Sequence, residues 1–298
     1  MAQPDGQAQQ GQAASWNARN GEVWAEQQAL LDRLFLPFEQ RLAGIVRASG
    51  ARTVLDIGCG AGATTLAVAR DLARQGTCLA SPCPEGPCPD GTCTGLDISA
   101  PLVAAARRRA AAEGAGNARF ILGDAQRHSF APAGFDAVIS RFGVMFFDAP
   151  ESAFANIRRA VGPGAGLAFV AWRRAAENPF MIAAETAAAP ILPALTRRDP
   201  AAPGQFAFGD ADRVQRILAG SGWRDIDIAP LDVPCSLPET DLAIYATRMG
   251  RVGLLLPDLD AATRASVTAA VGRAFAPYLS AGAARFTAAC WLVRARAG

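Results

Sequence analysis

Residues 54–62 read Val-Leu-Asp-Ile-Gly-Cys-Gly-Ala-Gly, an apolar run followed by three glycines at alternate positions. The run has the character of a buried strand, and a helical pattern begins directly after the third glycine. Glycine allows positive φ angles and lets a ligand approach the main chain without meeting a Cβ atom. The start of the next helix adds free N–H groups and the positive end of a helix dipole. This strand-turn-helix therefore predicts a site for an anionic or adenosyl ligand.

The spacing of the glycines distinguishes two kinds of ligand. Dinucleotide-binding turns have the pattern G-x-G-x-x-G, whereas this turn has G-x-G-x-G and carries Asp56 before its first glycine. A carboxylate is unfavourable beside a pyrophosphate because like charges repel at close range. The same carboxylate suits the ammonium of a methionine group. The turn thus favours a methionine-containing ligand over a dinucleotide.

Outward from this turn, short apolar runs alternate with helical patterns. Short apolar strands between helices are typical of a parallel sheet that is covered on both faces. We therefore predict an α/β fold, Rossmann-like and doubly wound, with the ligand-binding core in residues 51–175. Strands are expected at residues 53–57, 94–98, 118–122, 135–140 and 166–172, and helices at 64–74, 101–113 and 151–161.

Two further acidic residues follow strands of this predicted sheet. Asp97 ends the second strand, where its two oxygens suit both hydroxyls of a ribose, although a solvent-exposed turn would also use aspartate. Asp124 follows the third strand and suits the exocyclic amine of an adenine. Ligands of open α/β sheets bind outside the carboxyl ends of the strands. Asp56, Asp97 and Asp124 are therefore expected to share one edge and one ligand.

The segments on either side of the core are expected to be mostly helical. Residues 1–15 are interpreted as a disordered tail and residues 16–50 as an N-terminal helical lid, whose two helices separate around Pro37. Residues 176–298 are predicted to form cap segments and to complete the sheet. Within them we expect an irregular stretch at 175–209, helices at 210–219, 240–255 and 260–278, and strands at 225–230 and 284–294.

Composition limits the classes of function. Apolar residues make up 51% and charged residues 19% of the 298 residues, and the net charge is +2. Such a balance does not favour nucleic acid as a partner, because phosphate-backbone binding requires clustered positive charge. No apolar run reaches the roughly 18 residues that a membrane span needs, and the start lacks the features of a secretion signal. The sequence thus predicts a cytoplasmic protein without a transmembrane segment.

Four cysteines recur every five residues in a stretch that is rich in proline and glycine. They are Cys78, Cys83, Cys88 and Cys93. Structural zinc sites usually join two closely spaced cysteines to two distant ones, a pattern that this even spacing does not match. Residues 77–93 are therefore interpreted as a flexible hairpin insertion and no metal site is predicted, with a thiolate-bound zinc ion as the alternative.

With these motifs in place, residues 54–172 resemble the core of the class I S-adenosylmethionine-dependent methyltransferases. Residues 135–147, Phe-Asp-Ala-Val-Ile-Ser-Arg-Phe-Gly-Val-Met-Phe-Phe, are similar to the branch that contains enzymes of ubiquinone and menaquinone biosynthesis. A pattern of Trp16, Trp24, Gln27 and Asp32 is similar to bacterial members of that branch. The long cysteine-containing stretch departs from the short connection that is usual in the family.

The resemblance implies a seven-stranded sheet with a reversed last strand, for which residues 284–294 are the candidate. It implies S-adenosylmethionine as the cofactor, with the methionine group at Gly58, Cys59 and Gly60, ribose at Asp97, and adenine near Ile98, Asp124 and Ala125. It also implies a contact around residues 140–142. Together with the residue chemistry, this makes the expected cofactor-binding set Asp56, Gly58, Cys59, Gly60, Asp97, Ile98, Asp124, Ala125 and Arg141.

The sequence thus predicts an enzyme that moves a methyl group to a small-molecule acceptor that is quinone-like, aromatic or lipid. Such transfer mainly requires alignment of the acceptor, so a general base is optional. His128 is the only histidine and a weak candidate for that base. The alternatives are a nicotinamide-dependent oxidoreductase, which the glycine spacing and Asp56 disfavour, and a nonenzymatic protein that binds an adenosyl ligand.

Four apolar residues are weaker candidates for the acceptor site. Trp16 and Trp24 either close over the acceptor or, as we favour, pack the N-terminal helices on the sheet. Phe142 and Met145 either line the cleft or belong to the core. Besides cofactor binding, Arg141 has two alternative roles: it could bind an acidic group of the substrate or cap a helix.

Overall fold

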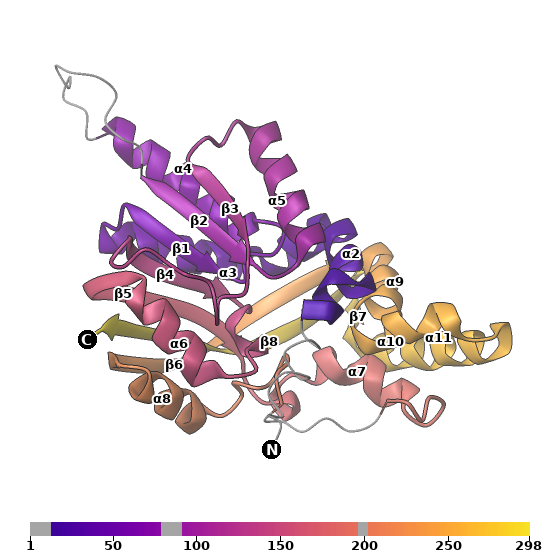
Figure 1. The fold of residues 1–298 in the computed structure, drawn as a ribbon. Coiled ribbons are helices and arrows are strands. Elements are labelled where there is room, and N and C mark those ends of the chain that lie inside the picture. The colour runs from indigo at the N-terminus through magenta and orange to yellow at the C-terminus, as the bar shows by residue number, and fades with distance from the viewer. Residues whose placement is uncertain (1–12, 79–90, 196–201) are drawn as a thin grey trace.

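The computed structural model describes residues 13–78, 91–195 and 202–298. Its central sheet has the strand order β3-β2-β1-β4-β5-β8-β6, and the short strand β7 pairs with β8 (Figure 1). The first five strands are mutually parallel, and β8 is antiparallel to both β5 and β6. The doubly wound seven-stranded path with its reversed last strand is therefore confirmed. The strands are β1 (Thr53–Ile57), β2 (Thr92–Asp97), β3 (Ala118–Leu122), β4 (Phe135–Arg141), β5 (Val161–Trp172), β6 (Trp223–Pro238), β7 (Leu279–Ser280) and β8 (Ala283–Ala297).

Helices cover the sheet and extend beyond one of its ends. One buried cluster joins residues of β1 and β4 to α3 and α4, and a larger one joins the sheet to α6, α8 and the C-terminal helices. The helices α7, α9, α10 and α11 gather beyond the end of the sheet near which α2 lies (Figure 1). The helices are α2 (Arg19–Glu26), α3 (Gln28–Ser49), α4 (Ala63–Cys78), α5 (Ala100–Glu113), α6 (Pro150–Arg159), α7 (Pro179–Ala188), α8 (Ala211–Gly220), α9 (Glu239–Arg248), α10 (Gly250–Leu255) and α11 (Ala261–Phe275).

The two N-terminal helices do not separate at Pro37, so that prediction is wrong. α2 ends at Glu26, and α3 continues for 22 residues with Pro37 inside it. An internal proline costs roughly 3 kcal/mol through its missing hydrogen bond and its ring clash. Phe35 and Phe38 flank the proline, and both are buried against the sheet. Burial of large side chains along one continuous helix therefore outweighs the local cost of the proline.

The C-terminal third is more regular than its sequence suggests. The stretch at 175–209, which we expected to be irregular, contains α7, and β6 extends over 16 residues instead of six. The helix expected at 240–255 is divided into α9 and α10, because Met249 has extended backbone angles and Gly250 a φ of +67°. The helix after residue 210 is confirmed, with the Asp210 side chain accepting a hydrogen bond from the Arg213 N–H at its N-terminus.

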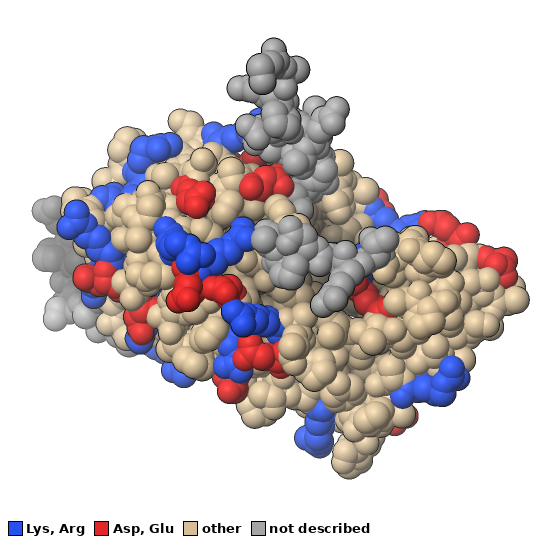
Figure 2. Space-filling model, turned by 90° about the horizontal axis from the view of Figure 1, so that it is seen from below, with Lys and Arg blue, Asp and Glu red and all other residues tan. Residues whose placement is uncertain are grey.

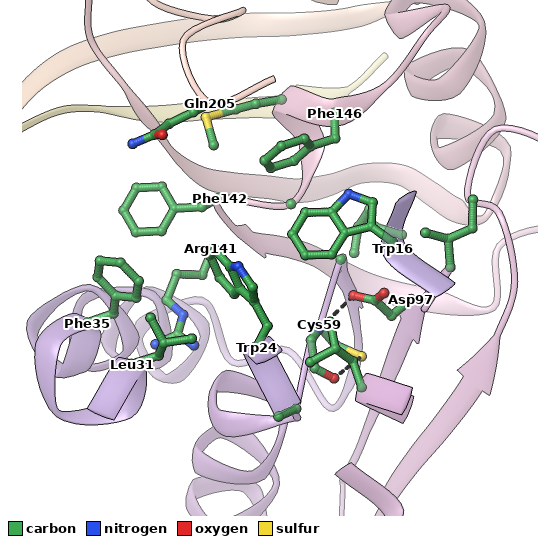
Figure 3. Close-up of a pocket in the computed structure, with 18 of the residues that line it drawn as sticks. Trp16, Trp24, Leu31, Phe35, Cys59, Asp97, Arg141, Phe142, Phe146 and Gln205 are labelled. Atoms are coloured by element: carbon green, nitrogen blue, oxygen red, sulfur yellow. Dashed lines mark hydrogen bonds between the residues drawn. The ribbon is translucent and has the colours of Figure 1, made fainter. Parts of the chain in front are cut away.

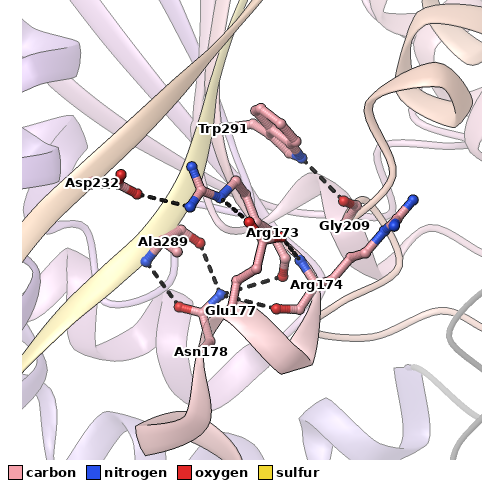
Figure 4. A network of polar contacts seen from close by, with 8 residues as sticks. All are labelled: Arg173, Arg174, Glu177, Asn178, Gly209, Asp232, Ala289 and Trp291. Atoms are coloured by element: carbon pink, nitrogen blue, oxygen red, sulfur yellow. Dashed lines mark hydrogen bonds and ion pairs between the residues drawn. The ribbon is translucent and has the colours of Figure 1, made fainter.

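A polar network fixes the start of this C-terminal part to the sheet (Figure 4). The side chain of Asn178 is 1% exposed and makes a two-way bridge to Ala289 of β8. Its Nδ2 donates to the Ala289 carbonyl and its Oδ1 accepts from the Ala289 N–H, both at 2.9 Å. Arg173 pairs with Asp232 of β6 at 3.1 Å and lies over the Trp291 ring. The chain therefore leaves β5 along a defined path toward α7.

The predicted insertion overlaps the sheet at its end. Cys93 lies in β2, where its neighbours are Val54 of β1 and Ala118 of β3, and it is fully buried. Burial raises the pKa of its thiol well above the ordinary value. Cys93 is thus a core residue, and β2 begins two residues before the predicted start. Cys83 and Cys88 lie outside the described residues.

Surface charges are dispersed over the face that Figure 2 shows. Acidic and basic side chains alternate on one part of this face, and a broad adjoining part is largely uncharged. Arg294 and Asp227 form one exposed ion pair, at 2.6 Å. Among the helices of the described residues, none combines the length and apolar character that crossing a membrane requires.

Candidate functional site

A cavity of about 260 Å³ opens at the carboxyl ends of β1, β2 and β4 (Figure 3). The N-terminal residues line one wall, the sheet edge another, and α7, α9, α10 and α11 contribute a third. Apart from His128, every site residue named from the sequence lines this cavity. These residues are Trp16, Trp24, Asp56, Gly58, Cys59, Gly60, Asp97, Ile98, Asp124, Ala125, Arg141, Phe142 and Met145.

The glycine turn adopts the conformation that its sequence requires. Gly58, Gly60 and Gly62 all have positive φ, at +67°, +56° and +85°. A Cβ atom on Gly58 would lie 2.6 Å from the Cα atom of Gly143, so the turn packs main chain against main chain. A Cβ atom on Gly60 would meet no atom within 4 Å. The main chain at Gly60 is therefore free for a ligand to approach.

Asp97 is held rigidly at the end of β2. Its Oδ2 accepts a hydrogen bond from the Gly60 N–H at 2.8 Å, and its Oδ1 accepts from the Ser99 N–H at 2.9 Å. Burial raises the pKa of this carboxyl, and the backbone donors oppose that effect. A carboxylate has about four lone-pair sites, so Asp97 still has capacity to accept from a ligand. Trp16 lies beside Asp97 in the cavity (Figure 3).

Asp56 has one bonded and one unbonded carboxylate oxygen. The side chain is 1% exposed, and its Oδ2 accepts from the Thr65 hydroxyl at 2.6 Å. Its Oδ1 is buried and has no hydrogen-bond partner. Burial raises the pKa of Asp56 to about 7, against the opposing effects of Thr65 and Arg141. A buried acceptor without a donor is costly unless a ligand supplies one.

Arg141 presents the complementary group from the end of β4. Its Nη1 is buried without a partner, and its guanidinium lies 5.8 Å from the centre of the Phe35 ring. Burial lowers the pKa of Arg141, while the charges of Asp32, Glu39 and Asp56 raise it. The cation thus faces carboxylates and still has an unused donor. An anionic group in the cavity would satisfy that donor.

The loop after β3 forms the far side of the sheet edge. Oδ1 of Asp124 accepts from the Gln126 N–H at 2.9 Å, and the side chain of Gln126 in turn accepts from the Ala149 N–H. Asp148 also lines the cavity, and burial together with the charge of Asp124 raises its pKa. Buried Asn156 donates to the carbonyls of Ala125 and His128, which holds the loop in place. Acceptor oxygens therefore collect where an adenine amine was expected.

The structure places His128 apart from the cavity. His128 is the single site candidate that is not among the lining residues. Its ring meets Phe130 edge-on with 4.7 Å between the ring centres, and its carbonyl accepts from Asn156. A packing role explains these contacts, so the geometry gives no support to the sequence-based candidate base.

Aromatic side chains dominate the rest of the cavity. Phe142 has a φ of +62°, unusual for a residue with a side chain, and its ring stacks on Trp172 with 4.5 Å between the centres. Trp16 meets both Trp24 and Phe146 edge-on, each at 5.4 Å. The two tryptophans therefore pack on each other and also line the cavity, while their contact with the acceptor stays a prediction. The remaining apolar wall comes from Met181, Tyr245, Met249 and Phe275.

Comparison with known proteins identifies the core. A family model described as a methyltransferase domain matches residues 54–164. Residues 54–164 form a class I S-adenosylmethionine-dependent methyltransferase domain. The matched segment begins in β1 and contains the glycine turn, Asp97, Asp124 and Arg141. The resemblance that was inferred from the motifs is thus confirmed.

Curated relatives are methyltransferases by name. A demethylmenaquinone methyltransferase of Renibacterium salmoninarum is 29% identical over 121 residues, which are 38% of this chain and 51% of that protein. The chain thus spans about half the length of this relative. An aklanonic acid methyltransferase of a Streptomyces strain is 27% identical over 57% of this chain and 73% of its own length. A nocamycin O-methyltransferase of Saccharothrix syringae is 25% identical over 70% and 72%.

Solved structures share the fold of the methyltransferase domain. The YcgJ protein of Bacillus subtilis aligns with a TM-score of 0.53 and 15% identity, over 86% of this chain and 98% of that chain. A putative methyltransferase of Bacillus halodurans aligns with a TM-score of 0.54 and 16% identity over the same shares. At such identities the likeness concerns the fold alone.

Several residues that line the cavity were not predicted from the sequence. Gln28, Leu31 and Phe35 line the cavity from α3, and their spacing of three and four residues is that of one helix face. The same spacing is also typical of a helix face that packs into a hydrophobic core, so it does not by itself indicate a cavity. Tyr245 and Met249 come from α9 and the residue after it, and no local pattern indicates that these elements reach the cavity.

Proposed function

We propose that this chain transfers a methyl group from S-adenosylmethionine to a small-molecule acceptor held in the aromatic part of the cavity. The observation that carries the proposal is the pair of unpartnered buried atoms, Oδ1 of Asp56 and Nη1 of Arg141. They have opposite charge, belong to neighbouring strands and line one cavity. An α-amino-acid group supplies both an ammonium and a carboxylate, so it would satisfy both atoms.

The remaining donor contacts follow from the sheet edge. We assign the methionine group to the turn at Gly58, Cys59 and Gly60, because the space beside Gly60 is open. We assign the ribose hydroxyls to Asp97, whose bonds to Gly60 and Ser99 fix the orientation of its oxygens. We assign the adenine to the pocket wall formed by the residues that follow β2 and β3, namely Ile98, Asp124 and Ala125.

For methyl transfer, the main task of the protein is to position the acceptor relative to the methyl group. Bound S-adenosylmethionine supplies a methyl group that its sulfonium already makes electrophilic. The side chains of the cavity then hold the acceptor in line with that group and exclude water, and such orientation contributes ~7 to 11 kcal/mol in well-ordered systems. The strained backbone of Phe142 and its stack on Trp172 supply a rigid wall for this purpose.

The aromatic wall supports a flat, apolar acceptor of quinone-like, aromatic or lipid character. The names of the three relatives refer to demethylmenaquinone, aklanonic acid and nocamycin, which supports a small-molecule acceptor. Burial raises the pKa of the Tyr245 phenol, and the Glu185 carboxylate is paired with Arg251 at 3.2 Å. The raised pKa leaves the Tyr245 phenol unsuited to remove a proton near neutral pH.

Calorimetric titration tests the donor assignment. We expect S-adenosylhomocysteine to bind the wild-type chain and NADH not to bind, and the reverse result would select the oxidoreductase. A screen of aromatic acceptors with methyl-labelled S-adenosylmethionine then tests transfer. We expect labelled product from the wild type and none from Asp97→Ala. Donor binding with no transfer to any acceptor would instead favour a nonenzymatic adenosyl-binding protein.

A further inference from the structure

A third unpartnered atom lines the same cavity. Gln28 is the first residue of α3, and its Oε1 is buried without a hydrogen-bond partner. It lies outside the matched methyltransferase domain, which begins at residue 54. Together with Asp56 and Arg141, the cavity thus contains three buried polar atoms that nothing within the described residues satisfies. Buried polar groups are nearly always bonded, so three in one place indicate a polar ligand.

Gln28 lies on the face of α3 whose other residues approach Arg141. Phe35, two turns further along the helix, packs under the guanidinium of Arg141. Asp32, one turn from Gln28, acts on the charge of that same arginine. Figure 3 shows Arg141 beside Trp24 and facing Leu31 and Phe35 of this helix face. The cavity-facing residues of α3 therefore form the wall opposite the ends of β1 and β4.

We propose that Gln28 binds the α-amino-acid group of the methyl donor, completing from the N-terminal helix a site that Asp56 and Arg141 begin. This inference rests on the proposed function. An ammonium has three N–H donors, more than Asp56 can accept through its one free oxygen, and Oε1 of Gln28 supplies a second acceptor. Arg141 supplies the donor for the carboxylate. Three groups on α3, β1 and β4 thus match the two charges of the amino-acid group.

The assignment links donor binding to residues 13–27, which we call the N-terminal strap. Asn17 bonds to the main chain of Ile98 and Ala100, and Ser99 donates to the Trp16 carbonyl. Toward the C-terminal helices the strap makes exposed polar contacts: Glu26 pairs with Arg248, and Arg19 pairs with Asp258 and donates to the Leu254 carbonyl. Exposed pairs contribute little to stability. A donor bound by Gln28 at the end of the strap would therefore add a substantial contact that holds it closed.

Two ligands separate this role from a structural one. S-adenosylhomocysteine carries the amino-acid group, and methylthioadenosine is the corresponding nucleoside thioether without it. We expect Gln28→Leu to weaken S-adenosylhomocysteine at least about tenfold in calorimetry, because a charged group loses a hydrogen bond. Binding of methylthioadenosine should stay within about twofold, which also shows that the variant is folded. Gln27→Leu is the matched control, since Gln27 does not line the cavity, and it should leave both ligands unchanged.

The possible outcomes distinguish a failure of the role of Gln28 from a failure of the proposed function. Equal binding of S-adenosylhomocysteine by wild type and Gln28→Leu would overturn the role of Gln28 and leave the proposed function intact. Equal losses for both ligands would also overturn it, because the effect would then not concern the amino-acid group. Absence of S-adenosylhomocysteine binding by the wild type would overturn the proposed function itself.

Hydrogen exchange gives an independent readout of the strap. We expect S-adenosylhomocysteine to slow amide exchange in residues 13–27 of the wild type at least about threefold more than methylthioadenosine does. In Gln28→Leu the two ligands should protect the strap equally. Equal protection by both ligands in the wild type would overturn the link between the amino-acid group and the strap.

Discussion

Asp56 combines a buried, unpaired oxygen with a pKa of about 7. Because burial is the main cause, the free protein holds this carboxyl protonated below pH 7 and ionised above it. Only the ionised form attracts an ammonium. We therefore expect affinity for S-adenosylhomocysteine to fall as pH decreases through 7, with binding about tenfold weaker at pH 6 than at pH 8. Calorimetry across this range measures the effect.

Two controls isolate the carboxyl in this titration. Methylthioadenosine has no ammonium, so its affinity should be nearly constant from pH 6 to pH 8. Asp56→Asn cannot ionise and should bind S-adenosylhomocysteine weakly, with a flat pH profile. A profile of Asp56→Asn that keeps the wild-type slope would assign the titration to another group.

His128, unlike Asp56, is not expected to contribute to the reaction. Its ring packs on Phe130 and does not line the cavity. We expect His128→Asn to retain kcat/KM within about twofold of the wild type on the acceptor found by labelled screening, because positioning requires no base. A loss of more than about tenfold with unchanged donor binding would restore His128 as a catalytic residue.

At the scale of elements, features that depend on nearby residues can be predicted from the sequence, whereas features that depend on long-range packing cannot. The glycine turn, the strand-end residues Asp97 and Asp124 and the N-cap Asp210 follow from short-range chemistry, and the structure places each where it was expected. The path of α3 through Pro37 depends on the burial of Phe38 against distant strands. Such contacts have no signature in the nearby sequence.

The site shows the same division. Neighbouring glutamines 27 and 28 are chemically identical in the sequence, where the family pattern drew attention to Gln27. The start of α3 at residue 28 turns Gln28 toward the cavity, and this depends on the break between α2 and α3. Tyr245 reaches the cavity through the packing of α9 near α11. Helix breaks and long-range docking therefore account for the residues that the sequence analysis missed.

Asn178 is the contact that determines how the C-terminal elements attach to the sheet. Replacing it with alanine removes both bonds to Ala289, so the buried Ala289 N–H loses its side-chain acceptor, whereas the Ala289 carbonyl keeps its bond from the Arg173 N–H. We expect Asn178→Ala to lower the free energy of unfolding by about 3 kcal/mol. Urea denaturation measures this. Arg174→Ala, which removes only an exposed pair with Asp210, should change it by less than about 1 kcal/mol; equal effects would mean that the buried bridge has no special role.

At the scale of the whole molecule, the cavity joins two parts of the chain with different tasks. The sheet edge provides the charged groups that we assign to the donor, namely Asp56, Asp97 and Arg141, and α3 adds Gln28. The elements after β5 provide mainly apolar side chains, among them Met181 and Phe275. The relatives align over parts of the chain only, from 38% to 70% of it. We propose that the C-terminal elements select the acceptor and that the sheet edge binds the donor.

This division predicts that substitutions in the two parts have separable effects. Tyr245 lines the cavity from α9, and its phenol donates to the Met181 sulfur at 3.2 Å, a weak acceptor that a substrate oxygen would replace. We expect Tyr245→Phe to lower kcat/KM for an oxygen-bearing acceptor about tenfold. Affinity for S-adenosylhomocysteine should stay within about twofold. Asp97→Ala should weaken that affinity more than tenfold. If Tyr245→Phe weakened donor binding as strongly as acceptor turnover, the separation of donor and acceptor sites would be wrong.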